Sequence, residues 1–279
     1  MKTLATTVFV LLAFAANSVL CRLALHETHI DPPSFTAIRL LSGAVTMGLL
    51  LRVARPGLRL GGDWISASAL LVYAVLFSFA YVAVTTGTGA LLLFGAVQLV
   101  MIGVGVLSGE RMGWHIAGGW LVAVSGLVLL LLPGISAPSL WPATMMIGAG
   151  VAWGIYSLRG RRSLDPLRDT AGNFVRSVPA VLLIAAIFGS WANLDHRGAL
   201  LALLSGSAAS GLGYAAWYTV LPRLGAIVAA NLQLSVPVIA ALGGLLFSSE
   251  SISLRLAVAA VLVLGGVAVV TSAPRRAHS

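Results

Sequence analysis

The stretch LATTVFVLLAFAANSVLCRLA, residues 4–24, is an apolar run long enough to cross a membrane, and the chain holds ten such runs. A span needs about 20 mostly apolar residues to cross the hydrocarbon layer. By this measure the spans lie at 4–24, 35–52, 64–84, 88–107, 114–132, 141–158, 171–190, 198–220, 226–247 and 254–271. Only 9% of the residues are charged, against about 25% in a soluble domain. Because lipid forces the backbone to pair within each span, the sequence predicts an all-α membrane protein with ten transmembrane helices.

Basic residues between the spans predict the orientation, because Lys and Arg beside a span stay in the cytoplasm. One side of the membrane holds three of them, Arg22, Arg197 and Arg255. The other side holds twelve: Lys2, Arg52, Arg55, Arg59, Arg111, Arg159, Arg161, Arg162, Arg168, Arg223, Arg275 and Arg276. We therefore expect a multi-pass protein of a bacterial inner (plasma) membrane with both termini cytoplasmic. The net charge of +9 fits this topology and contact with anionic lipid as a partner, and does not indicate nucleic-acid binding.

The two halves of the chain, 1–136 and 137–279, repeat the same features in the same order. The matches are Phe14-x3-Ser18-x3-Arg22 with Trp153-x3-Ser157-x3-Arg161, Arg39 with Arg176, and the acidic turn at Glu110 with that at Glu250. Each half has five spans, an odd number, so the second half enters the membrane inverted. Inverted five-helix repeats are typical of secondary transporters that work by alternating access. Duplication for packing alone is the alternative.

These features resemble the drug/metabolite transporter superfamily, specifically its EamA-type ten-helix transporters. The resemblance is carried by NSVLCR (17–22) with FTAIR (35–39), by GTGALLLFGAVQ (87–98) with GER (109–111), and by PRLGA (222–226) with Pro237 and Glu250. Within the superfamily the chain looks most like the YddG-type amino-acid exporters. The resemblance implies a central aromatic cavity and export of amino acids or other small metabolites. A proline usual for the family in span 4 is replaced here by Val97.

Polar and aromatic residues inside the spans are the candidates for lining the cavity, since buried amides and hydroxyls in lipid must face protein or a water-filled space. The predicted substrate-binding residues are Asn17, Tyr73, Phe77, Tyr81, Gln98, Trp153, Tyr156, Tyr214, Trp217, Tyr218, Asn231 and Gln233. Such a pocket suits a zwitterion with an apolar side chain, whose ammonium group an aromatic face can hold. Packing between helices, or a place in an interfacial belt, is the alternative for each residue.

Charged residues inside the spans are few. The carboxylates lie in loops or at span ends, so no proton-coupling residue is expected, and facilitated export or exchange fits at least as well. Arg39 and Arg176 lie about one turn into their spans. They are expected to be gating or structural charges, and direct contact with an anionic substrate is the other reading.

Catalysis is the alternative that the motifs support least. His26-x4-Asp31 and His26-x2-His29 match short acyltransferase and metal-binding patterns, but no catalytic domain surrounds them. Cys21 is the single cysteine, so neither an intrachain disulfide nor a thiolate metal cluster can form. The sequence predicts no enzyme, metal or cofactor, and a small molecule as the ligand. A drug exporter or a receptor without net transport remains the runner-up, as either a monomer or a homodimer that pairs through the glycine-rich spans 5 and 10.

Overall fold

The architecture comes from a computed structural model that describes residues 2–57, 59–107, 114–133, 137–190, 194–220, 232–233 and 235–272. Every regular element in these ranges is a helix, and a helix lies in each of the ten predicted spans. The elements are α1 (Lys2–Glu27), α2 (Pro32–Ala54), α3 (Trp64–Tyr81), α4 (Thr86–Leu107), α5 (Trp114–Leu131), α6 (Leu140–Gly160), α7 (Pro166–Phe188), α8 (His196–Leu204), η2 (Ser205–Leu212), α9 (Gly213–Val220), α11 (Val236–Phe247) and α12 (Leu254–Ser272). Residues 226–231 and 234 of the predicted ninth span lie outside the described residues.

Four aspartates begin four of these helices. The side chains of Asp31, Asp63, Asp165 and Asp195 accept hydrogen bonds from N–H groups in the first turns of α2, α3, α7 and α8. A carboxylate at this position satisfies N–H groups that the helix itself leaves without partners. Half of the eight acidic residues are thus used to start helices, which explains why they lie at span ends.

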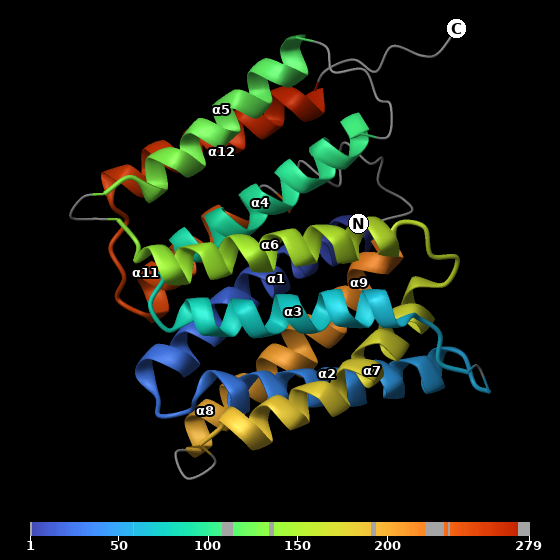
Figure 1. Ribbon diagram of the computed structural model, residues 1–279. Helices are drawn as coiled ribbons and strands as arrows, with labels where there is room; N and C mark the ends of the chain where they lie inside the picture. Colours follow the sequence, from blue (N-terminus) through green and yellow to red (C-terminus); the bar gives the residue numbers. More distant parts are fainter. Residues whose placement is uncertain are drawn as a thin grey trace, which may run out of the picture.

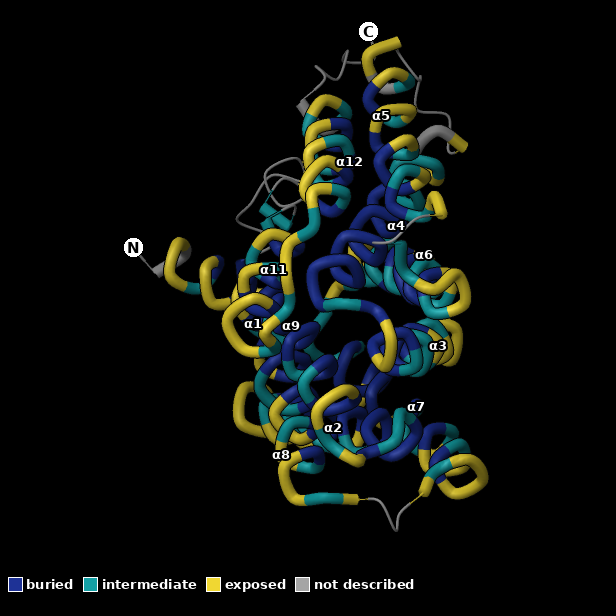
Figure 2. The backbone as a smooth tube through the Cα atoms, turned by 90° about the vertical axis from the view of Figure 1, so that its left-hand side faces the viewer, coloured by how far each residue is buried: buried dark blue, intermediate teal, exposed yellow. Residues whose placement is uncertain are grey.

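The two halves pack mainly on each other. Helices α1–α5 form the first half and α6–α12 the second; α2 packs on α7, α3 on α6, α4 on α6 and α11, and α5 on α12. Figures 1 and 2 show α5 and α12 side by side at one edge of the bundle, with α2, α7 and α8 toward the opposite edge. The core of the protein is therefore an interface between halves.

Glycine allows α5 and α12 to approach closely. A Cβ added at Gly119 would lie 2.7 Å from the carbonyl oxygen of Gly266, and one added at Gly266 would lie 2.5 Å from that of Gly119. Their neighbours Gly118 and Gly265 have no atom within 4 Å of an added Cβ. One glycine stripe thus joins the two helices within the chain, while the adjacent positions face away.

Eight residues of the eighth span form a π-helix, η2, which the hydropathy pattern does not predict. Its sequence, SGSAASGL, is almost all small residues. An added Cβ on Gly206 would lie 2.1 Å from the carbonyl oxygen of Arg39, so η2 touches the backbone of α2 there. Wide helical turns of this kind occur frequently at functional sites.

The outside of the bundle is apolar and the inside holds polar groups, as expected in a membrane. Leu12, Val53, Leu121 and Leu183 are among the large apolar side chains that are exposed, whereas Arg39 is buried. Six helices of the described residues are long and apolar enough to cross a membrane, and three shorter apolar helices accompany them. Figure 2 shows the exposed residues along the outer faces of the helices. This is the distribution of a polytopic membrane protein, confirming the class predicted from composition.

Candidate functional site

Aromatic rings from both halves meet in the middle of the bundle. Trp153 on α6 has its ring centroid 4.9 Å from that of Tyr73 on α3 and 5.0 Å from that of Tyr214 on α9. Phe14 on α1 contacts Trp153, Tyr214 and Trp217 edge-on. We call eight of the connected rings the aromatic cluster: Phe14, Tyr73, Phe77, Trp153, Tyr156, Phe174, Tyr214 and Trp217. Most of these side chains are buried, but Trp153 is only partly buried and keeps an accessible surface.

A chain of polar side chains runs along the aromatic cluster. Ser205 of η2 donates its hydroxyl hydrogen to Asn17 Oδ1 at 2.7 Å, and Asn17 Nδ2 donates to the Tyr73 hydroxyl at 3.2 Å. Arg39 Nη2 donates to the same hydroxyl at 3.0 Å. Four helical elements, α1, α2, α3 and η2, are therefore joined by buried polar contacts beside the rings.

Arg39 lies deeper than the sequence indicates. Because α2 begins at Pro32, the residue is about two turns into its helix, and its side chain is 1% exposed. Its guanidinium carbon lies 4.8 Å from the ring centroid of Phe77 and 5.2 Å from that of Tyr73. Nε and Nη1 have no hydrogen-bond partner among the described residues.

The acidic residues that the structure describes are engaged away from Arg39. Glu27 pairs with Arg197, Asp63 with Arg159, Asp165 with Arg55 and Glu250 with Arg22. The other three bind N–H or hydroxyl groups at helix ends: Asp31, Asp169 and Asp195. Within the described ranges, the positive charge at the aromatic cluster therefore has no protein counter-ion.

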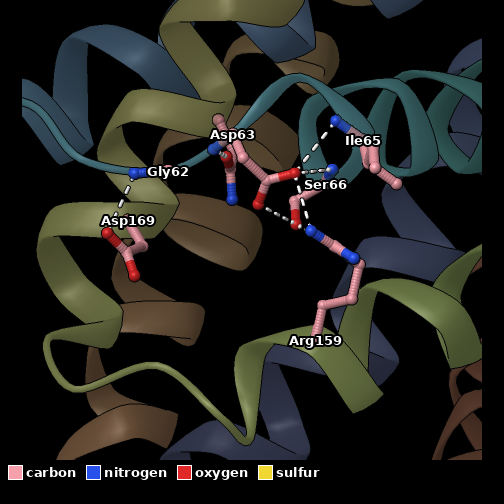
Figure 3. Close-up of polar contacts among 7 residues, drawn as sticks. Gly62, Asp63, Ile65, Ser66, Arg159 and Asp169 are labelled. Atoms are coloured by element: carbon pink, nitrogen blue, oxygen red, sulfur yellow. Dashed lines mark hydrogen bonds and ion pairs between the residues drawn. The ribbon is translucent and has the colours of Figure 1, made fainter.

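The start of α3 is joined to the second half by a dense polar network (Figure 3). Asp63 Oδ1 accepts from Arg159 Nη2 at 2.9 Å, and Ser66 Oγ accepts from Arg159 Nε at the same distance. The Gly62 N–H donates to Asp169 Oδ1 at 2.9 Å. Burial of Asp63 acts to raise its pKa, but hydrogen bonds from Ser66 and the Arg159 charge outweigh it, so the pKa lies below its usual value. We call this region the Asp63 end.

A pocket of about 180 Å³ opens at the Asp63 end, between α3, α6 and α7. Asp63, Arg159 and Asn173 line its polar side. Tyr156 lies in its wall, and the same ring stacks on Trp153 with the centroids 5.5 Å apart. Tyr156 therefore links the wall of the pocket to Trp153 in the aromatic cluster.

The opposite end of α3 is joined to the second half by one buried ion pair. Arg22 Nε donates to Glu250 Oε1 at 3.0 Å, and the two side chains are 8% and 12% exposed. Arg22 Nη1 also donates to the carbonyl oxygens of Tyr81 and Val82. Glu250 Oε2 accepts from the backbone N–H of Thr86, where α4 begins. We call this region the Arg22 end; the 18 residues of α3 separate it from the Asp63 end by about 27 Å.

The predicted site residues separate into groups in the structure. Asn17, Tyr73, Phe77, Trp153, Tyr156, Tyr214 and Trp217 come together at the aromatic cluster. Tyr81 lies between the cluster and the Arg22 end: its ring contacts Phe77 edge-on with the centroids 4.7 Å apart, and its hydroxyl donates to the Thr86 carbonyl oxygen. Gln98 is buried in α4, and Gln233 is half-buried. The side chain of Tyr218 and the whole of Asn231 lie outside the described residues.

The two arginines inside the spans have different surroundings. Arg176 donates from Nη1 to the Gly61 carbonyl oxygen and stands 6.0 Å from the ring centroid of Trp64, both next to the Asp63 end. Arg39 binds a hydroxyl among the rings.

Three residues at the cluster are absent from the predicted set: Phe14, Phe174 and Ser205. The repeat pairs Phe14 with Trp153, and this was the one available signal.

Known proteins with similar sequences agree with this architecture. The sequence profile of the EamA-like transporter family matches residues 140–272. The chain is 52% identical to PA1977 of Pseudomonas aeruginosa, described as an uncharacterized protein, over 98% of this chain and 96% of that one. It is 21% identical to YoaV of Bacillus subtilis, described as an uncharacterized transporter, over 95% of both chains. A solved crystal structure that is 22% identical shares the fold, with a TM-score of 0.66 over 95% of this chain and 98% of that one.

The fold and its buried centre define the class: a multi-helix membrane protein with a polar and aromatic site between two halves. Residues 140–272 carry a domain of the EamA-like transporter family, and a relative described as an uncharacterized transporter matches along nearly the whole chain. The EamA domain expected from the sequence is therefore present, and together with the relative described as a transporter it indicates a membrane transporter.

Proposed function

We propose that the protein is a secondary transporter that exports small metabolites, amino acids first, across a bacterial inner membrane by alternating access. The observation that carries the proposal is the position of the aromatic cluster. Its rings come from α1 and α3 of the first half and from α6, α7 and α9 of the second, between the Asp63 end and the Arg22 end. Transporters built from two repeats bind their substrates at this kind of interface.

The helix pairing supports an inverted repeat of residues 1–136 and 137–279. If each span is exchanged for its counterpart in the other half, the α3–α6 pair becomes the pair of α1 with η2 and α9, and the α4–α6 pair becomes α1–α11. Both of these pairings are present. The α2–α7 and α5–α12 pairs are unchanged by the exchange. A pseudo-twofold relation between the halves accounts for this pattern.

The charge bias of the loops assigns the Arg22 end to the outside and the Asp63 end to the cytoplasm. Alternating access then breaks one junction while the other stays closed. A reporter fused after Ser279 should be cytoplasmic, and one inserted in the 193–197 loop should be external. The opposite result would overturn this orientation and the inverted assignment of the halves.

Purified protein in liposomes, offered a panel of amino acids with and without a pH gradient, tests the function. Flux of a neutral amino acid should persist after an ionophore collapses the gradient, because the described carboxylates lie at helix ends and not inside the spans. Complete loss of downhill flux would reveal a proton site. Saturable binding without any net flux would instead favour a receptor, and flux of other amphipathic compounds alone would favour a drug or metabolite exporter.

A further inference from the structure

Arg39 carries an uncompensated charge in the buried interior of the protein. Its guanidinium has five N–H donors, yet the structure gives it one acceptor, the Tyr73 hydroxyl, and two of its three nitrogens have no partner. A buried charge without a counter-ion is strongly unfavourable, and the flanking rings of Tyr73 and Phe77 offset only part of that cost. In a membrane protein, an ionisable residue in this position indicates a functional site.

We propose that Arg39 is the binding group for the carboxylate of the transported substrate. This inference rests on the proposed transport function and names the substrate chemistry of the same site. Arg39 binds the anion because guanidinium and carboxylate form strong, geometrically matched hydrogen bonds. The charge that the described part of the chain leaves without a partner is then neutralised by the substrate.

The neighbours of Arg39 set the rest of the ligand. Tyr73, which accepts from Arg39, packs against Trp153 with their centroids 4.9 Å apart. An apolar or aromatic body attached to the carboxylate therefore meets ring surface within a few ångströms. Asn17 and Ser205 add polar groups on the other side of the Tyr73 hydroxyl. The ligand class is therefore a small carboxylate with an apolar or aromatic side chain. Because Arg39 is 1% exposed, the carboxylate reaches it only when the helices part.

Arg176 provides a matched control within the same chain. It occupies the repeat position of Arg39, but it donates to the backbone carbonyl of Gly61 and does not touch the aromatic cluster. Its loss should lower stability and leave ligand affinity unchanged. Loss of Arg39 should weaken ligand binding and should not lower stability, because removing a buried charge without a counter-ion relieves a cost of folding.

Equilibrium dialysis with the full-length protein in lipid nanodiscs tests the proposal with three probes: phenylalanine, 3-phenylpropanoate and phenethylamine. The wild type should bind the two carboxylates more tightly than the amine. Arg39→Met should weaken binding of both carboxylates by about thirtyfold or more, since the lost partner is a buried charge. Binding of the amine should be unchanged, and the melting temperature should be no lower than in the wild type. Arg39→Lys, which keeps the charge without the planar fork, should weaken the carboxylates by a smaller factor and secures the test if the methionine variant does not fold.

Several outcomes would overturn the proposal. These are equal wild-type affinity for the amine and the carboxylates, no binding of any probe, or unchanged carboxylate affinity in Arg39→Met with a lower melting temperature. Flux in liposomes is measured separately. Binding that depends on Arg39 without net flux would leave the carboxylate site standing and overturn transport. Flux that does not depend on Arg39 would leave transport standing and overturn the carboxylate site.

Discussion

Trp153 is the residue on which we expect substrate binding to depend most. Its ring lies between Tyr73 and Tyr214, yet part of it stays accessible. Trp153→Ala removes a large contact surface, so flux per folded molecule should fall close to background, while Trp153→Phe should keep part of it. The alanine variant should also be less stable, by less than the about 3–5 kcal/mol of a fully buried tryptophan. Flux normalised to protein that stays monodisperse in detergent measures the effect.

Trp141→Ala is the control for this change. Trp141 is on the same helix, α6, but is 71% exposed, so its loss should leave normalised flux at the wild-type level. If Trp153→Ala lowered the melting temperature but kept normal flux per folded molecule, the ring would only pack between helices, and the cavity assignment would be wrong.

Asp63 makes stability depend on pH in the acid range. Its pKa is lower in the folded protein than in the unfolded chain, so the ionised form favours folding. Its contribution is complete above the unfolded pKa of about 3.9 and is lost as the pH falls through the lower folded pKa. The melting temperature of the wild type should therefore drop below about pH 4, and the drop should be smaller in Asp63→Asn.

Asparagine at position 63 separates the two roles of the carboxylate. Asn also caps helices well, so Asp63→Asn loses mainly the exposed pair with Arg159, which contributes about 0–1 kcal/mol. Asp63→Ala loses the cap as well and should be less stable than Asp63→Asn at pH 7. Identical acid limbs in the wild type and Asp63→Asn would show that Asp63 does not govern this transition.

Residue identity predicted which side chains come together better than it predicted what surrounds each of them. Asn17, Tyr73 and Trp153 stood out because polar or amphipathic side chains in lipid need partners, and they are at the cluster. Phe14 and Phe174 did not stand out, because an apolar ring inside a span looks the same whether it faces lipid or a neighbouring helix. The depth of Arg39 was underestimated because its helix begins three residues earlier than the apolar run.

The segment between α2 and α3 is sensitive to a single methyl group. Gly62 has φ +75°, and an added Cβ would lie 2.2 Å from Asn173 Oδ1 and 2.6 Å from the Asp169 carbonyl oxygen. Gly62→Ala must therefore adopt an unfavourable backbone conformation and also push α7 away. We expect a large loss of thermal stability and a weaker junction at the Asp63 end, measured by thermal unfolding in lipid nanodiscs.

Gly57 isolates the backbone part of this effect. It has a similar φ of +80°, but no atom lies within 4 Å of an added Cβ. Gly57→Ala should therefore carry only the conformational cost, about 1–2 kcal/mol. Equal destabilisation by the two substitutions would show that contact with α7 contributes nothing.

Helix boundaries were largely predictable, but helix type was not. Apolar runs indicated each span because their length must match the membrane, and the aspartate caps mark several starts. The π-helix η2 was not predicted. Small residues such as those of SGSAASGL favour close helix packing in an ordinary α-helix as well as in a π-helix. Its contact with α2 depends on Gly206 meeting a backbone carbonyl, a three-dimensional match that hydropathy does not contain.

The two halves are held together unequally at the two ends of the molecule. At the Arg22 end, Glu250→Gln removes the charge that compensates a buried arginine, a change that costs about 3–5 kcal/mol when the partner is left unpaired. That end should then open more often. Cys21, the single cysteine, is buried next to Arg22, so its labelling by a membrane-impermeant maleimide should speed up by about tenfold or more.

Glu27→Gln is the matched control for opening. It breaks the pair of Glu27 with Arg197, whose side chains are 29% and 62% exposed, and exposed pairs contribute little. Labelling of Cys21 should stay at the wild-type rate. Equal labelling rates in Glu250→Gln and the wild type would mean that the Arg22–Glu250 pair does not control access.

The buried guanidinium also has an electrical consequence. Arg39 is fixed on α2 and does not leave with the cargo, so the charge moved in each cycle is the charge of the substrate alone. A zwitterion then crosses without net current, and the resting potential neither assists nor opposes it. A monoanion released from the same site is driven outward by an inside-negative potential, by about 2.3 kcal/mol for each 100 mV. If Arg39 binds the carboxylate of an exported anion as proposed, the membrane potential alone would drive the anion out, with no partner ion flowing inward.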